Sequence, residues 1–388
     1  MDAKIGIDPI KIIKDEKLGV NIKKDDNINL FRYYYFKSYS NLAHFLFNDN
    51  QDFSNYSEKE IEKEFNDYFN KLSTQQKIKK IMKIVDVFNH KSKCSPLSLY
   101  NDDSCLTTET IEKLLIKKNY YLDLPEIIKL KKEQPDKYRT YLIGLMKKEY
   151  NIISGFDIYK AIVKRLNQPS LSGSGDKIIN EIITDKELLN LILDAYKPFG
   201  PVDGAWLDNM EIMNVIKQYE TYLNKNKEYK FYFSGVYPSD FEKYPDFQIN
   251  EINKKFLDDG NIKFIGVVFN HDKRGQPGSH WVGLYIDLLN SKAYYYDSVG
   301  KKPKDEYVNY VKHLFKKCDL NYDDKTLEYN KTERQTSGGS CGIYAISFII
   351  SMASGINFND YLKLTLKPEF MKYLRLLFFN DKNDLDNI

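Results

Sequence analysis

Apolar and polar residues follow two different patterns along the chain. In the first half, apolar and aromatic residues recur at helical spacing, as in 58–70 (EKEIEKEFNDYFN), where Ser57 is a candidate N-cap. The same spacing predicts further helices over Gln75–Phe88, Thr107–Lys117, Pro125–Lys132, Asp136–Tyr150 and Phe156–Leu166. Together these segments predict a mainly helical N-terminal domain over residues 1–167.

A cluster of Pro, Ser and Gly at 168–177 (QPSLSGSGDK) interrupts the helical pattern. Such residues are typical of linkers, and a chain of 388 residues is long enough for two domains. We therefore predict a linker over 168–177 and a second domain over 178–388. A surface loop within a single domain is the alternative.

The second half alternates short apolar runs with further helical patterns. The segment 262–269 (IKFIGVVF) is nearly continuously apolar and β-branched, as expected of a buried strand. Strands are predicted over Phe231–Val236, Ile262–Phe269, Trp281–Ile286, Lys292–Tyr296 and Thr326–Tyr329. Helices are predicted over Asp185–Tyr196, Leu207–Tyr222, Asp305–Lys317, Cys341–Met352 and Pro368–Phe379. Helices around a small mixed sheet make this an α+β domain.

Charge and cysteine content narrow the choice of function. The net charge is only +3, from 58 basic and 55 acidic side chains, so no nucleic-acid or membrane partner is required. The four cysteines are scattered without a Cys-x-x-Cys pair, which argues against a zinc site or a redox dithiol. This distribution favours a reducing compartment.

Targeting segments are not visible in the sequence. The first 20 residues carry charges throughout, and the longest apolar run, 343–353 (IYAISFIISMA), is too short to span a bilayer. We therefore expect a soluble, intracellular protein.

His280 differs from the other four histidines in its setting, because it lies where a loop (Gly278–Trp281) enters an apolar strand. A side chain there is rigidly held yet reachable by substrate. Asp287, further along the same strand, would lie about 23 Å away at about 3.3 Å per residue, too far to orient the imidazole. A hairpin turning near Asn290 instead returns Asp297 beside His280, where its carboxylate would accept the Nδ1 proton.

Cys341 follows the small, turn-forming residues of 335–340 (QTSGGS) and begins a long apolar segment, which places it at a helix N-terminus. The helix dipole and a nearby imidazolium would both favour its thiolate. Its backbone N–H is then one oxyanion donor, and the side-chain amide of Gln335 is the candidate for a second. Taken singly, Cys341, His280 and Asp297 each have an ordinary structural explanation; the case rests on their combination.

The combination resembles the ubiquitin-like-protein proteases, a family that includes the SUMO proteases, the adenovirus protease and core-protein proteases of large DNA viruses. Four motifs carry the resemblance: Trp206-Leu207-Asp208-Asn209, His280-Trp281, Tyr295-Tyr296-Asp297-Ser298, and Gln335 with Cys341-Gly342. The likeness covers roughly 185–379, half of the chain. It implies a papain-like, circularly permuted cysteine protease fold with a central mixed sheet flanked by helices.

Carried over by position, the resemblance implies His280 as base, Asp297 as its orienting carboxylate, Gln335 as oxyanion donor and Cys341 as nucleophile. No metal or organic cofactor is required for this chemistry.

The resemblance also implies substrate-binding roles for Trp206 and Trp281, the only two tryptophans of the chain. In SUMO proteases the matching pair encloses a narrow slot for a Gly-Gly sequence, since two flat walls admit a chain without side chains. Asn209 stands where many SUMO proteases have Asp, with Asp208 one place earlier. This departure puts SUMO recognition in doubt and leaves the peptidase chemistry unaffected.

Two upstream segments, 95–99 (SPLSL) and 105–111 (CLTTETI), resemble regions that precede the protease domain in large cytoplasmic DNA viruses. This resemblance implies viral structural polyproteins cut after Gly-Gly as substrates. The host cytoplasm and the virion are then the expected locations, and the helical half is a candidate docking domain. Cys105 has no histidine in a comparable setting and is interpreted as structural.

Other functions stay open at this point. The enzyme could instead be a deubiquitinase or SUMO isopeptidase, or an acetyltransferase of the kind found among bacterial effectors on this frame. A non-catalytic scaffold is the alternative from a different class, although it gives no reason for the complete Cys, His, Asp and Gln set. Nucleic acid as an activator is also not excluded by the charge balance.

Overall fold

The computed structural model describes residues 93–95, 104–167, 177–224, 227–336, 338–363 and 368–385. The helices predicted over 58–70 and 75–88, and nearly all of the predicted linker, lie outside the described residues.

The chain forms two compact units. One contains Asn89–Pro198 together with Asn380–Ile388, and the other contains Phe199–Phe379. Residues 178–198, which the sequence pattern assigned to the second domain, are grouped here with the helical unit. The domain limits 1–167 and 178–388 stay a prediction.

The described part of the helical unit contains five helices that the sequence predicts, including the one over Asp185–Tyr196, and one helix that was not predicted. Its helices are α6 (Thr108–Lys117), α7 (Pro125–Glu133), α8 (Pro135–Tyr150), α9 (Gly155–Asn167), α10 (Lys177–Thr184) and α11 (Lys186–Ala195). The hydroxyl of Thr107 accepts a hydrogen bond from the backbone N–H of Thr110, which caps the start of α6. Helix α10 was not predicted because it directly follows the Gly- and Ser-rich stretch.

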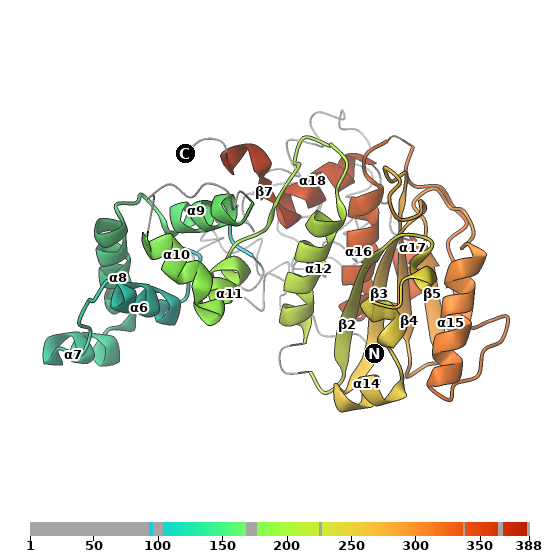
Figure 1. The fold of residues 1–388 in the computed structure, drawn as a ribbon, viewed down its shortest axis with the longest axis horizontal. Coiled ribbons are helices and arrows are strands. Elements are labelled where there is room, and N and C mark those ends of the chain that lie inside the picture. The colour runs from blue at the N-terminus through green and yellow to red at the C-terminus, as the bar shows by residue number, and fades with distance from the viewer. Residues whose placement is uncertain are drawn as a thin grey trace, which may run out of the picture. The chain divides into compact units, whose positions relative to one another are not determined.

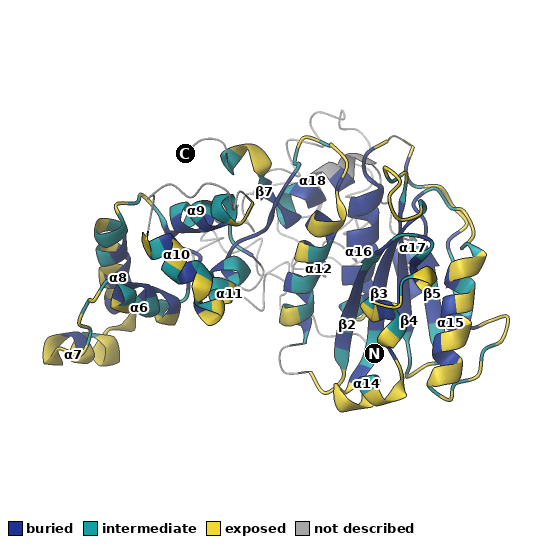
Figure 2. Cartoon of the chain, viewed as in Figure 1, coloured by how far each residue is buried: buried dark blue, intermediate teal, exposed yellow. Residues whose placement is uncertain are grey.

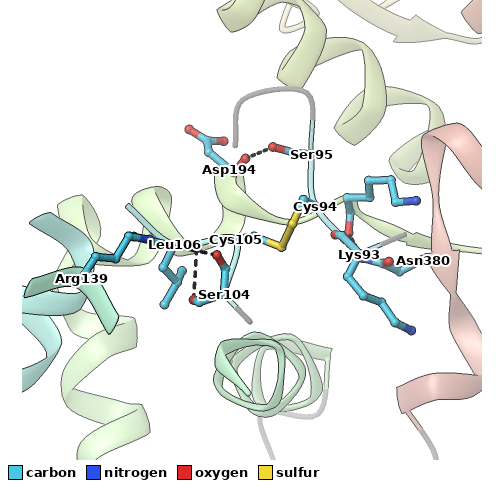
Figure 3. The surroundings of a disulfide bond; sticks show 10 residues. Lys93, Cys94, Ser95, Ser104, Cys105, Leu106, Arg139, Asp194 and Asn380 are labelled. Atoms are coloured by element: carbon cyan, nitrogen blue, oxygen red, sulfur yellow. Dashed lines mark hydrogen bonds between the residues drawn. A yellow bond between two sulfur atoms is a disulfide. The ribbon is translucent and has the colours of Figure 1, made fainter. Parts of the chain in front are cut away.

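A disulfide bond joins Cys94 and Cys105 in this unit (Figure 3). The neighbouring Ser104 anchors the segment, since its hydroxyl accepts from the N–H of Leu106 and its carbonyl accepts from Arg139 at 3.1 Å. The sequence analysis favoured a reducing compartment, in which cysteines stay unpaired, whereas these two cysteines form a disulfide. The two cysteines are 11 residues apart, and this spacing alone does not predict a disulfide. The bond forms because tertiary contacts bring the two chain segments close together. Cys105 has the structural role that the sequence suggested.

The other unit is built on a five-stranded sheet, shown in Figure 1. Its order is β2 (Lys230–Tyr237), β3 (Ile262–Asn270), β4 (Trp281–Asp287), β5 (Lys292–Tyr296) and β6 (Leu327–Tyr329). The pairs β2–β3 and β5–β6 are parallel, whereas β3–β4 and β4–β5 are antiparallel. The predicted α+β class with a central mixed sheet and flanking helices is confirmed.

Helices cover both faces of this sheet, which explains why its strands are almost continuously apolar. Helices α12 (Asn209–Leu223), α16 (Cys341–Ala353) and α18 (Pro368–Phe378) share one hydrophobic core with residues such as Phe233 and Val268. Helix α15 (Asp305–Lys317) shares the other core with Ile265 and Leu284. The remaining short elements are β1 (Phe199–Gly200), α13 (Gln248–Glu251), α14 (Lys254–Asp259), α17 (Phe358–Lys363) and β7 (Asn380–Asp381).

Helix α16 is the most deeply buried helix of this unit. Every residue from Cys341 to Met352 is buried, and Figure 2 shows the helix in dark blue along its length. It packs against β3 and β4, so its N-terminus is fixed relative to the ends of the strands. Within the described ranges, no helix is both long and apolar enough to cross a membrane.

Candidate active site

The predicted hairpin brings His280 and Asp297 together. Strands β4 and β5 pair antiparallel with Gly283 opposite Tyr296, so the chain segments just outside the hairpin lie side by side. The imidazole Nε2 of His280 lies 2.7 Å from Oδ1 of Asp297. Asp287 lies at the opposite end of β4, where it accepts a hydrogen bond from the N–H of Asn290.

The nitrogen that contacts Asp297 differs from the expectation. The sequence argument assigned Nδ1 to the carboxylate, whereas the structure uses Nε2. The register explains the difference: Gly283 faces Tyr296, so Asp297 continues opposite Val282 and lies diagonally across from His280. The imidazole spans this offset with Nε2, the ring nitrogen further from the backbone. Nδ1 is thereby left for a partner on the other side of the ring.

The electrostatics of His280 favour its protonated form. Burial by itself lowers the pKa of His280, but hydrogen bonds with Asp297 and with the thiol of Cys341 outweigh it and raise the pKa to about 9. Asp297 is completely buried, so its charge depends on close partners rather than on water. His280 is therefore an imidazolium at neutral pH, in contact with the side chain of Asp297.

Asp297 is fixed by its neighbours as well as by His280. Its Oδ1 also accepts from the N–H of Val299 at 2.9 Å. The side chain of Asn330, after β6, accepts from the N–H of Asp297 at 2.8 Å and donates to its carbonyl at 2.6 Å. The two bonds make Asn330 a clamp on the backbone of Asp297, so the carboxylate has little freedom to turn away from the imidazole.

Cys341 is the first residue of α16, as the sequence predicts. Its side chain is buried, and its interaction with His280 places the thiol beside the imidazole. The first backbone N–H groups of a helix have no partner inside the helix, so the N–H of Cys341 faces the site as a donor.

Gln335 is held by Ser298. The hydroxyl of Ser298 donates to Oε1 of Gln335 at 2.8 Å, and the N–H of Gln335 donates to the carbonyl of Ser298 at 2.9 Å. Because Oε1 is engaged, the amide presents its Nε2 end, which is a donor only. The side chain is buried and its orientation is set by this bond.

A groove of about 470 Å³ lies next to the His280 segment. All three predicted substrate-binding residues, Trp206, Asn209 and Trp281, line it, together with the loop 272–278. Trp281 is nearly buried, and its indole N–H donates to the carbonyl of Leu207 at 2.9 Å, whereas Trp206 is 53% exposed. One wall is therefore rigid and the other open to an incoming chain.

A second histidine lies beside the first. The ring centroids of His271 and His280 are 5.0 Å apart in an edge-to-face arrangement, and the N–H of His271 donates to the carbonyl of His280. Burial, followed by the charge of His280, lowers the pKa of His271 to about 4. His271 is therefore neutral at physiological pH.

Sequence reasoning missed several residues that support this site. Ser298, Asn330 and His271 are polar residues without a periodic or motif signal of their own. Their roles depend on contacts across the sheet, although the position of Ser298 directly after Asp297 was a usable hint. Within the ranges that the structure describes, no group of three or more His, Cys, Asp or Glu side chains could hold a metal ion.

Comparison with known families agrees with this arrangement. Residues 207–386 match the model of the Ulp1 protease family, C-terminal catalytic domain. The chain thus contains a Ulp1-family catalytic domain. This domain, together with the thiol proteases among the similar proteins, identifies a cysteine peptidase.

The similar proteins include viral proteases. A thiol protease of Acanthamoeba polyphaga mimivirus is 29% identical over 276 residues, which are 70% of this chain and 82% of the relative. A cysteine protease of African swine fever virus is 23% identical over 118 residues, 30% of this chain and 43% of the relative. A crystal structure of the African swine fever virus protease aligns with a TM-score of 0.46 at 15% identity, over 74% of this chain and 96% of that one.

Proposed function

We propose that this cysteine peptidase cleaves the peptide bond after Gly-Gly sequences, with Cys341 as nucleophile, His280 as base, Asp297 as the carboxylate that orients it, and Gln335 as oxyanion donor. The observation that carries the assignment is the contact between Nε2 of His280 and Oδ1 of the buried Asp297, together with the interaction of the same imidazole with the Cys341 thiol.

The reaction follows from these positions. The proton of the Cys341 thiol passes to His280 before substrate binds, so the two rest as thiolate and imidazolium, and the thiolate attacks the carbonyl carbon of the scissile bond. The N–H of Cys341 and Nε2 of Gln335 donate to the oxyanion. The imidazolium protonates the departing amine as the carbon–nitrogen bond breaks. A water molecule, deprotonated by His280, then attacks the thioester, and the acid product leaves with the thiolate and imidazolium restored.

The preference for Gly-Gly rests on the groove. Trp206 and Trp281 are flat aromatic walls at the approach to His280, and Asn209 lines the same groove. A substrate without side chains next to the scissile bond fits between two aromatic faces, whereas a branched side chain collides with them.

Viral structural polyproteins are the substrates we propose, because the similar proteins include viral proteases. The test uses a panel of short peptides with a Gly-Gly-Xaa sequence, treated with the wild-type protein and with Cys341→Ala. Cleavage after the second Gly that is lost in the variant supports the proposal. Cleavage at other sequences, or equal cleavage by both proteins, contradicts it.

A second candidate is the removal of a ubiquitin-like modifier. It is favoured by the name "SUMO-1 cysteine protease" given to relatives in African swine fever virus. Folded SUMO and ubiquitin fusions, run beside the peptides, separate the two candidates. Cleavage of a folded fusion without cleavage of short peptides assigns the enzyme to modifier removal.

A further inference from the structure

Arg375 is a buried charge that the mechanism does not use. It lies in α18, and its side chain has no exposed surface. A buried guanidinium is costly unless its N–H groups find acceptors, so its partners are informative about its role.

The acceptors are three backbone carbonyls from two loops. The guanidinium donates to the carbonyl of Pro201 at 2.8 Å, to that of Gly204 at 3.4 Å, and to that of Gly339. Among the described residues, no carboxylate forms an ion pair with it. The hydrogen bonds of Arg375 thus go to backbone carbonyls, while the charge of Asp203 interacts with it at longer range.

The two loops are the ones that carry the groove wall and the nucleophile. Gly204 leads to Trp206, and Gly339 leads to Cys341. They touch directly: a Cβ placed on Gly339 would lie 2.6 Å from the carbonyl oxygen of Gly204 and 3.8 Å from the Trp206 ring. Gly339 also has a φ of +87°, which an L side chain rarely adopts.

The carbonyls of Gly204 and Gly339 share one donor, because both accept from Nη2 of Arg375. The planar fork of arginine supplies several N–H groups in a fixed geometry, which lysine cannot do. The positive charge of Arg375 also lies close enough to interact with Cys341.

From this geometry we infer that Arg375 is a positioning residue, which fixes the loop that carries Cys341 against the loop that carries Trp206. The inference rests on the proposed role of Cys341 and adds a residue to it. Without the fork, the two loops lose their common anchor, so the thiol and the groove wall are no longer held in one arrangement.

Arg375→Lys tests this inference because it keeps the charge and most of the volume but loses the fork. We expect kcat on a Gly-Gly-Xaa peptide to fall by about 10- to 100-fold, as for a small displacement of reacting groups, with a smaller change in KM. Gly339→Ala is an independent variant, because its added methyl group would push the two loops apart while the Arg375 side chain is unchanged. The same loss of kcat is expected.

The second readout is the alkylation of Cys341 by iodoacetamide as a function of pH, measured with Cys318→Ala as background. It needs no substrate, so it remains informative if the cleavage preference proposed above is wrong. In both Arg375→Lys and Gly339→Ala, the alkylation curve should move to higher pH.

Leu374→Ala is the matched control, since Leu374 is a buried core residue of the same helix. It should lower the melting temperature while leaving kcat and the alkylation curve of the folded protein unchanged. If Arg375→Lys behaves like this control, or keeps wild-type kcat and alkylation, Arg375 is only a core residue and the inference is wrong.

Discussion

Ser298 orients Gln335, because its hydroxyl donates to Oε1 of the amide at 2.8 Å and so presents the Nε2 donor. Gln335→Ala should therefore lower kcat by about 10²- to 10³-fold, as expected for the loss of an oxyanion donor. Ser298→Ala should cost about 10-fold, because it removes one neutral hydrogen bond that sets the amide orientation.

A double-mutant cycle on peptide cleavage checks this relationship. Once Gln335 is replaced, the additional loss of the Ser298 hydroxyl should have little effect, so the two changes are expected to be strongly non-additive. Additive losses would mean that Ser298 acts independently of the amide.

Cys341→Ala should abolish peptide cleavage, by at least about 10³-fold, and leave the melting temperature close to that of the wild type. The chain offers a matched control in Cys318, the other free cysteine, which is partly buried at the end of α15. Cys318→Ala should retain full activity. If Cys318→Ala loses peptide cleavage and Cys341→Ala retains it, Cys318 and not Cys341 is the nucleophile.

Asp297→Asn should lower kcat/KM by about 10²- to 10⁴-fold, because the imidazole loses both its orientation and its charge partner.

The pKa of His280 is raised to about 9, so the pair stabilises the fold fully below the ordinary histidine pKa of 6.5 and loses this effect as pH rises through 9. Urea unfolding at pH 6 to 10 measures this. The stability difference between wild type and variant should shrink with rising pH; a constant difference would contradict the ion pair.

His271 should give the opposite dependence on pH. Its pKa is lowered to about 4, so its neutral form stabilises the fold above pH 6.5, and this contribution is lost as pH falls from 6.5 toward 4. His280, Asp297, Lys301 and Lys304 are the charged groups around it. His271→Gln should therefore lose less stability than the wild type between pH 6.5 and 4, measured by thermal unfolding. If the stability of His271→Gln and of the wild type falls equally between pH 6.5 and 4, other groups cause the loss of stability in acid.

Trp206→Ala should raise KM for a Gly-Gly-Xaa peptide several-fold and weaken the discrimination against branched residues at the Gly positions. The reason is that Trp206 is an exposed aromatic wall of the groove. Met210 is similarly exposed, at 56% against 53%, but does not line the groove. Met210→Ala should leave KM unchanged, so equal effects in both variants would remove Trp206 from substrate binding.

Local patterns were sufficient to predict most of the sheet unit. The alternation and length of apolar runs located β3, β4 and β5, and simple hairpin geometry then selected Asp297 over Asp287 as the partner of His280. The turn-forming residues before Cys341 correctly marked the start of α16. These inferences succeed because each depends on residues that are near in sequence or joined by a single turn.

Longer-range features could not be predicted in the same way. The choice of Nε2 over Nδ1 depends on the diagonal offset set by the β4–β5 register, which the sequence does not specify to one residue. Asn330, Arg375 and the Cys94–Cys105 disulfide act between segments that are distant or irregular. Helix α10 was obscured by the flexible-looking stretch before it.

The order of the site residues along the chain has a consequence for biosynthesis. Ribosomes make the hairpin with His280 and Asp297 before they make α16, which carries Cys341, and α18 follows later still. A growing chain thus holds His280 and Asp297 before it holds Cys341. Under the roles proposed above, peptide cleavage begins only after translation has passed Cys341, so a partly made protease unit is inactive.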